Sequence, residues 1–98
     1  MKGNRVVVTG LGAVTPLGLD VASTWAGICA GKSGAAMIDQ FDAKGFSTQF
    51  SASVKNFSVE GYLEARDARH MDPLIQYGMV AGIQAFRDSG VAVTDENA

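Results

Sequence analysis

The strongest pattern of hydrophobic and polar positions lies between residues 72 and 90 and predicts a long helix. Asp72 precedes it as a helix cap, and Pro73 takes the first helical position, where a missing backbone N–H costs nothing. Gly90 follows as the left-handed residue that ends many helices. Because apolar side chains cover most of its circumference, we expect this helix to be largely buried. Those side chains are Leu74, Ile75, Tyr77, Met79, Val80, Ile83 and Phe86.

A second helical pattern begins after Asp20, whose carboxylate can accept from the free amides of a first helical turn. Val21, Trp25 and Ile28 follow at helical spacing. Gly31 and the glycine-containing group after it end the pattern. The sequence therefore predicts a short helix that is capped by Asp20.

The segment between these two helices carries weaker signals. Residues 35–57 are expected to be extended, because apolar and polar side chains alternate loosely in its second half. Residues 59–69 mix charged side chains with Tyr62 and Leu63 and predict a short helix on the surface.

The first hydrophobic run, Val6–Val8, is β-branched and does not alternate with polar residues. Such a run is typical of a strand that is buried on both faces of a parallel sheet. The chain supplies few candidates for parallel neighbours, and it ends where the next strand of an α/β unit would begin. We therefore expect residues 1–98 to be the N-terminal part of a larger α/β enzyme, without a complete second domain.

The composition is that of a globular protein, with 98 residues, 47% hydrophobic and 18% charged, and a formal net charge of −2. Without a basic excess, nucleic-acid binding is not expected. Cys29 is the single cysteine, which excludes an internal disulfide and fits a reducing compartment. Polar residues and glycines interrupt the apolar N-terminus, so a secretory signal is not expected, and no stretch reaches the roughly 18 apolar residues of a bilayer span. We expect a soluble, cytoplasmic protein.

The stretch from Gly10 to Gly18 partly matches the glycine-rich turn that binds dinucleotide phosphates. That fingerprint requires G-x-G-x-x-G, but Thr15 occupies the place of the third glycine and Pro16 follows it. Asp20 would place a carboxylate near the pyrophosphate. These departures argue against dinucleotide binding, which remains an alternative that thermal stabilisation by NAD would test.

The same stretch fits another pattern. RVVVTGLGAVTPLG resembles the N-terminus of the condensing enzymes, the β-ketoacyl-acyl carrier protein synthases. STWAGICAGKSG (23–34), IDQFDA (38–43) and ARHMDPLIQYGMVAGIQAFRDSG (68–90) agree in the same order. The last segment resembles the type II synthases in its Met-Asp followed by Ile-Gln-Tyr-Gly. The resemblance covers essentially the whole chain.

The resemblance implies an α/β chain with the thiolase-like layered αβαβα fold, of which residues 1–98 form the N-terminal part. It also implies a homodimer without an organic cofactor, and we expect no metal site in this chain. Members of the family transfer an acyl chain from acyl carrier protein to a cysteine, and the carbanion formed by decarboxylation of malonyl-acyl carrier protein then attacks that thioester. A non-catalytic, chain-length-factor-like partner of a ketosynthase shares this fold and is the alternative function.

The family's catalytic cysteine and two histidines lie beyond position 98, so we assign no catalytic residue to this chain. Cys29 does not match the nucleophile, because it lies near the C-terminal end of its predicted helix. We expect Cys29 to be a small core residue. His70 does not match either catalytic histidine, and this chain alone is expected to be inactive.

The resemblance implies one functional site, a basic cluster that helps to dock the acidic carrier protein. Carried over by position, the cluster is Arg66, Arg69 and His70, which we call the basic patch. Arg66 and Arg69 are three residues apart and share a face of a helix. The family tends toward Lys or Arg at the position of His70, so the patch is expected to be weaker at neutral pH. The alternative is a solvated helix face, balanced by Glu64 and Asp67.

The remaining conspicuous residues are expected to be structural. Trp25 and Phe86 are large apolar side chains at helical positions and are expected in the core. Gly78 and Gly82 are four residues apart in the long helix, where they predict the close approach of another backbone.

Overall fold

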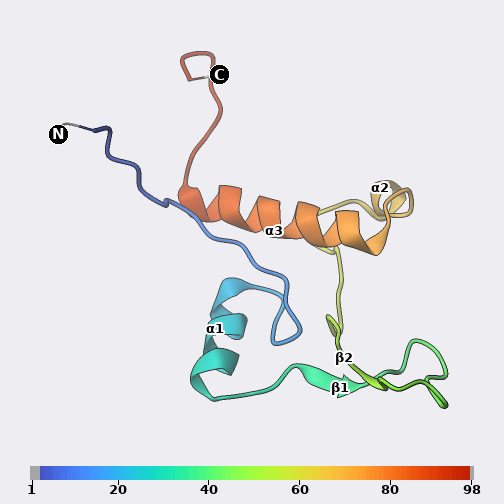
Figure 1. The fold of residues 1–98 in the computed structure, drawn as a ribbon. Helices are drawn as coiled ribbons and strands as arrows, with labels where there is room; N and C mark the ends of the chain where they lie inside the picture. Colours follow the sequence, from blue (N-terminus) through green and yellow to red (C-terminus); the bar gives the residue numbers. More distant parts are fainter. Residues whose placement is uncertain (1–2, 98) are drawn as a thin grey trace.

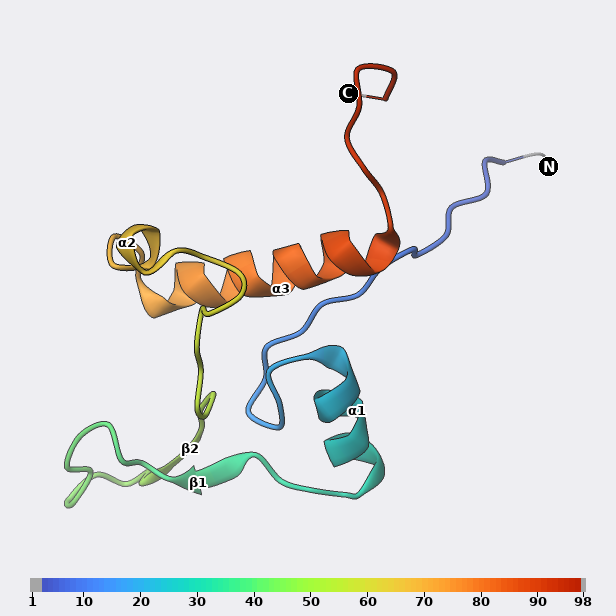
Figure 2. The ribbon, with the colours of Figure 1, turned by 180° about the vertical axis from the view of Figure 1, so that it is seen from behind.

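The computed structural model describes residues 3–97, in which three helices and one small hairpin are joined by extended segments (Figure 1). The elements are α1 (Val21–Cys29), β1 (Ala35–Met37), β2 (Phe50–Ala52), α2 (Ala65–Ala68) and α3 (Pro73–Ser89). In both views α2 lies at the N-terminal end of α3, and the hairpin lies away from α3 (Figure 2). The radius of gyration is 17.6 Å, whereas a compact domain of this size has about 13 Å. The arrangement is therefore open.

Helix α1 begins and ends where the sequence predicts. The backbone N–H of Ser23 donates to the Asp20 carboxylate over 2.8 Å, and the Ser23 hydroxyl accepts from the Asp20 N–H over 3.4 Å. This reciprocal capping satisfies amides that the first turn leaves unpaired. Gly31, with φ of 70°, follows the end of the helix in the left-handed region.

Helix α3 also has the predicted bounds. Pro73 is its first residue, and Gly90 ends it with φ of 71°. Asp72 occupies the N-cap position, but its side chain accepts no hydrogen bond from the helix. Its carbonyl oxygen accepts from the Gln76 N–H over 3.0 Å. The prediction of a side-chain cap at Asp72 was therefore wrong, although the helix begins at the predicted residue.

The expectation that α3 is largely buried was wrong for this chain. Val80 is 2% exposed, whereas Leu74 is 80% exposed and Phe86 is 51% exposed. The reason is that the N-terminal segment covers one side of α3, and the described residues place no layer on its other sides. Helix α3, which carries apolar side chains around most of its circumference, therefore exposes much of its surface to solvent in this chain.

The covered side of α3 is the one that faces the glycines of the N-terminal segment. A Cβ atom built on Gly10 would overlap the carbonyl oxygen of Ala85, and one on Gly12 would overlap that of Ala81. Ala81 and Ala85 are four residues apart and share one helix face. The predicted close approach does occur on α3, but at these alanines. Beyond the nearby backbone of α3 itself, no atom lies within 4 Å of a Cβ built on Gly78 or Gly82.

Two polar side chains of the same helix face bind the backbone of that segment. Asp88 accepts from the Leu11 N–H over 3.0 Å. Gln84 accepts from the Ala13 N–H over 3.0 Å and donates to the Leu19 carbonyl over 2.6 Å. Side chains of α3 thus take the place of a neighbouring strand for these backbone groups.

The prediction of a doubly buried strand at Val6–Val8 is not realised in this chain. The three residues are extended, but they are 89%, 67% and 79% exposed and belong to no strand of the structure. The described residues provide no strand beside them, so their backbone forms no ladder and their side chains have nothing to pack against.

The two predictions for the middle of the chain, an extended segment over residues 35–57 and a short helix over residues 59–69, are confirmed only in part. β1 and β2 form an antiparallel pair with Ala36 opposite Ser51, within the region that was expected to be extended. The predicted surface helix over residues 59–69 is shorter than expected. Residues 59–63 form a turn, in which the N–H groups of Tyr62 and Leu63 donate to the Val59 carbonyl, and α2 spans only Ala65–Ala68.

Three residues that were expected in the core are exposed. Trp25 is 63% exposed, Phe86 is 51% exposed, and Cys29, the last residue of α1, is also exposed. Among the described residues, the buried apolar side chains are Ala43, Ala68 and Val80. Because these side chains are few and small, the described segment has only a minimal core.

Candidate functional site

The residues of the predicted basic patch lie together on α2 and the turn after it. Arg66, Arg69 and His70 are all exposed. Helix α2, which contains Arg66 and precedes the other two, lies at the N-terminal end of α3 (Figure 1). Ala68, 6% exposed, is the residue of α2 that faces the protein. Burial of this small side chain keeps the charged residues beside it toward solvent. The structure therefore brings the three predicted residues to one exposed corner.

Hydrogen bonds fix the turn that carries the patch. The N–H of Arg69 donates to the Ala65 carbonyl over 3.1 Å, and the N–H of His70 donates to the Asp67 carbonyl over 3.2 Å. Gln76 of α3 then donates from Nε2 to the Ala68 carbonyl over 2.9 Å and to the Met71 carbonyl over 3.2 Å. Gln76 thereby ties both sides of the Arg69–His70 turn to α3. The sequence analysis missed this residue, because a glutamine within a helix carries no signal for such a role.

The charges of the patch are only partly balanced within the chain. Arg66 lies 3.7 Å from the Glu64 carboxylate, and both side chains are about three-quarters exposed (76% and 75%). Water screens such a pair, so it leaves Arg66 available to another carboxylate. Within residues 3–97, neither Arg69 nor His70 lies within ion-pairing distance of a carboxylate. These three side chains are therefore accessible from outside the chain.

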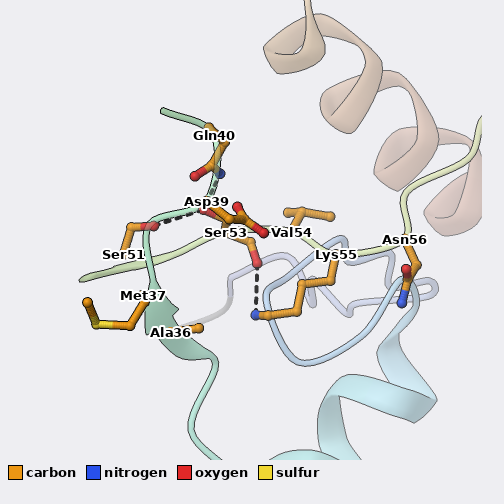
Figure 3. Close-up of a pocket in the computed structure, with 9 residues that line it drawn as sticks. All are labelled: Ala36, Met37, Asp39, Gln40, Ser51, Ser53, Val54, Lys55 and Asn56. Carbon is orange, nitrogen blue, oxygen red and sulfur yellow. Dashed lines mark hydrogen bonds between the residues drawn. The ribbon is translucent and has the colours of Figure 1, made fainter. Parts of the chain in front are cut away.

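A polar cavity of about 470 Å³ lies beside the hairpin (Figure 3). Its side chains bond mainly to one another and to the backbone. Lys55 donates to the carbonyls of Gly34 and Ser53 over 2.9 and 3.1 Å, and Gln40 donates to the Ser53 hydroxyl over 2.8 Å. These bonds link the segments that flank the two strands. None of the contacts pairs a nucleophile with a base, so we assign this cavity a structural role.

A more open groove of about 540 Å³ runs between α1 and α3, and Trp25 lies along it. Arg87 lies with its guanidinium carbon 5.2 Å from the centre of the Tyr62 ring and donates to the Gly61 carbonyl over 3.1 Å. This cation–π contact holds the turn before α2 against α3. Trp25 is exposed because the groove is open on its side.

The environment of Asp20 changes the pKa of its carboxyl group. The hydroxyl and then the backbone N–H of Ser23 bond to its carboxylate and hold the pKa of Asp20 below its ordinary value. Asp20 therefore acts as a helix cap, as predicted, and its charge stabilises the start of α1.

The described part of the chain shows neither a metal site nor a membrane-spanning helix. Residues 3–97 hold no group of three or more His, Cys, Asp and Glu side chains suited to a metal ion. None of the helices described is long and apolar enough to cross a membrane. Gly10 and Gly12, the remnants of a phosphate-binding fingerprint, face the backbone of α3, so no ligand can approach them from that side. The basic patch remains the candidate site.

Comparison with known proteins connects this arrangement to one family. The family model described as "Beta-ketoacyl synthase, N-terminal domain" matches residues 3–98. The chain is 51% identical over 98 residues to a 3-oxoacyl-[acyl-carrier-protein] synthase 2 of Vibrio cholerae, and 42% identical to a protein of the same name from Coxiella burnetii. Both alignments cover 100% of this chain and 24% of the relative. The chain thus spans about a quarter of the length of these curated relatives.

A solved structure agrees with these sequence matches. "The ishigamide ketosynthase/chain length factor" superimposes with a TM-score of 0.73 and 31% sequence identity, covering 88% of this chain and 21% of that one. The agreement extends over most of the chain, so the open arrangement of its elements is that of a segment within the thiolase-like α/β fold. On these matches of sequence and structure, the chain belongs to the β-ketoacyl synthase family.

Proposed function

We propose that this chain is the N-terminal part of a 3-oxoacyl-[acyl-carrier-protein] synthase of fatty acid synthesis. The observation that carries the proposal is the 51% identity over 98 residues to the Vibrio cholerae synthase 2. The open shape supports it, because the exposed Val6–Val8 and α3 need further protein to cover them. In this proposal the complete protein is an acyltransferase, and this chain supplies structure and a docking surface.

The proposed reaction is a decarboxylative Claisen condensation. A cysteine thiolate takes the acyl group from acyl carrier protein as a thioester, and the carrier thiol leaves. Malonyl-acyl carrier protein then loses CO₂, and the resulting carbanion attacks the thioester carbonyl. The C–C bond forms as the cysteine thiolate leaves. In this proposal the catalytic cysteine and two histidines belong to the part of the protein outside residues 1–98, so this chain contributes no reacting group and is inactive by itself.

The basic patch is proposed as part of the surface that binds acyl carrier protein in its acyl and malonyl forms. Its support is the exposure of Arg66, Arg69 and His70 together on the corner formed by α2. Guanidinium groups suit this role, because they stay charged and can donate two parallel hydrogen bonds to one carboxylate. Opposite charges would also steer the carrier protein toward the complete enzyme.

The complete protein is proposed to act as a homodimer in the cytoplasm. Family resemblance supports both statements, and the exposed apolar side chains of this chain are compatible with burial against further protein. Sedimentation of the purified complete protein at micromolar concentration tests the assembly: a mass of two chains is expected, and a monomer at all concentrations would contradict it.

A second candidate function is that of a non-catalytic, chain-length-factor-like partner. It is favoured by one observation, the structural match to a ketosynthase/chain length factor. The two functions differ in one assay of the complete protein without any other synthase. A synthase becomes acylated by acyl-acyl carrier protein and forms a 3-oxoacyl product when malonyl-acyl carrier protein is added. A chain-length-factor-like partner does neither alone and supports condensation only after a ketosynthase is supplied.

A further inference from the structure

Helix α2, which carries Arg66 of the basic patch, is too short to hold its own conformation. It consists of the residues Ala65–Ala68, and the side chain of Glu64 at its N-cap position makes no capping hydrogen bond. An isolated helix in water needs about 12 residues or more to be stable. The place and direction of α2 are therefore fixed by the contacts that hold the chain on either side of it.

Side chains of α3 hold the chain on both sides of α2. After α2, Gln76 binds two backbone carbonyls of the following turn. Before α2, Arg87 donates from its guanidinium group to the Gly61 carbonyl over 3.1 Å, and its guanidinium carbon lies 5.2 Å from the centre of the Tyr62 ring. In both views the chain runs from this turn beside α3 to its N-terminal end, where α2 lies (Figure 2). Arg87 and Gln76 thus anchor the two ends of one segment.

The two contacts of Arg87 fix the position and the rotation of the turn before α2. A guanidinium group is planar, so it can lie over an aromatic ring and also donate a hydrogen bond to a carbonyl. Gly61 has a φ of 85°, and the Tyr62 N–H donates to the Val59 carbonyl over 2.9 Å, so the held residues belong to a tight turn. Within residues 3–97 no carboxylate lies within ion-pairing distance of Arg87. Nothing in that part of the chain therefore competes with the turn for the guanidinium charge.

We infer that Arg87 is a positioning residue for the docking of the carrier protein, because it holds the turn from which α2 presents Arg66. The inference rests on the proposed function and adds a residue outside the basic patch to the same docking surface. Glu64 connects the two arginines, since it follows the held turn and its carboxylate lies 3.7 Å from the Arg66 guanidinium group. Arg87 does not touch the carrier protein. It orders the chain before α2 in advance, so that less ordering accompanies binding.

The test is the Kd of fluorescently labelled acyl carrier protein for the complete protein, measured by anisotropy for the wild type, Arg87→Ala, Arg66→Ala and the double variant. Arg87→Ala is expected to weaken binding about 2- to 5-fold, the effect of losing an exposed cation–π contact. Because Arg87 acts through Arg66, the same substitution should change the Kd little once Arg66 is alanine. Lys44→Ala is the control for charge, since it removes one exposed positive charge between β1 and β2 and should leave the Kd unchanged.

Substitutions of Tyr62 separate positioning from a direct contact between Arg87 and the carrier protein. Tyr62→Phe keeps the ring over which the guanidinium group lies, and it should bind the carrier protein as the wild type does. Tyr62→Ala removes the ring and is expected to weaken binding about 2- to 5-fold, with little further loss when it is combined with Arg87→Ala. If Arg87 touched the carrier protein directly, Tyr62→Ala would leave the Kd unchanged, and that result would overturn the inference.

Two further outcomes would overturn the inference while the docking proposal stands. In the first, Arg66→Ala weakens binding but Arg87→Ala does not. In the second, both weaken binding and the two losses multiply in full in the double variant. If Arg66→Ala leaves the Kd unchanged, the docking role of Arg66 fails and the inference fails with it. Thermal unfolding of each variant verifies that the complete protein remains folded, so that a higher Kd reports on the docking surface.

Discussion

Gly12 lies against the backbone of Ala81, with no room for a Cβ atom between them. The extended N-terminal segment can cross α3 only because this residue and Gly10 have no side chain. The glycines of the opening motif therefore bring the segment and the helix into contact. They leave no cradle for a phosphate on that side.

This contact predicts that Gly12→Ala destabilises the protein by about 1–3 kcal/mol, the usual cost of forcing an extra group into a packed contact. Gly3→Ala is the matched control in the same extended segment, because no atom other than those of Gly3 and its two chain neighbours lies within 4 Å of its Cβ position. Urea unfolding of the complete protein measures both changes. Equal free energies of unfolding for the two variants would contradict the close contact.

Gln84 provides a second prediction at the same crossing. Its side chain is bonded to the N–H of Ala13 and to the carbonyl of Leu19. Gln84→Leu leaves both partly buried backbone groups unpaired and is expected to cost about 1–3 kcal/mol in the free energy of unfolding. Gln40→Leu serves as the control, since Gln40 is exposed and its Nε2 donates to the Ser53 hydroxyl in a bond that is open to solvent. If Gln84→Leu lowers the free energy of unfolding no more than Gln40→Leu does, the hydrogen bonds of Gln84 do not hold the N-terminal segment against α3.

The cap of α1 gives a pH-dependent prediction. Because the folded-state pKa of Asp20 is below its ordinary value, its charge stabilises the fold above about pH 4. That contribution falls as the pH drops through the lower folded value. Asp20→Asn keeps a capping side chain at neutral pH but cannot titrate. The difference in unfolding free energy between wild type and variant should therefore shrink or change sign from pH 7 to pH 3.

Asp20→Ala provides the reference for that experiment, because it removes the cap at every pH and is expected to cost about 1 kcal/mol at neutral pH. If the wild type and Asp20→Asn lose stability in parallel on acidification, Asp20 is not the group responsible.

Gln76 predicts that carrier binding depends on a residue outside the basic patch. Gln76→Ala removes the two hydrogen bonds that tie the turn to α3, so Arg69 and His70 become less fixed. The expected result is a KM for acyl-acyl carrier protein that is about 2- to 5-fold higher, since ordering the turn must then accompany binding. Gln76→Glu cannot donate from the same position and should not rescue the KM. An unchanged KM in Gln76→Ala would remove Gln76 from the positioning of the patch.

Much of the local structure could be predicted from the sequence. The bounds of α1 and α3 follow from Asp20, Pro73 and Gly90, whose effects are confined to a helical turn. Several sequence segments that resemble the condensing enzymes and follow the same order along the chain predicted the family, and the match over residues 3–98 confirms it. The bounds of a helix can be read from the sequence because the residues that set them lie within one turn of its ends.

Burial could not be predicted in the same way. Trp25, Phe86 and the run Val6–Val8 are apolar, and the sequence analysis placed them in a core. Their exposure depends on which elements are present to cover them, and the chain spans only 24% of its curated relatives. The reverse error concerns one face of α3, which contacts the N-terminal segment although the sequence did not predict it. This face is formed by Ala81, Gln84, Ala85 and Asp88. Their helical spacing could be seen in the sequence, but two alanines and two polar residues do not indicate a contact with an extended segment.

The central claim about the site is that the basic patch binds the carrier protein. Its most direct measurement is the KM of the complete protein for acyl-acyl carrier protein after Arg66→Glu and Arg69→Glu are combined. Lys32→Glu with Lys44→Glu is the matched control, because both lysines are exposed, lie outside the patch and change the net charge equally. If the basic patch binds the carrier protein, the arginine variant should have a KM at least about tenfold higher, because two side chains that attract the acidic carrier protein are replaced by two that repel it. The lysine control should have a nearly unchanged KM. Equal KM values in the two variants would contradict it.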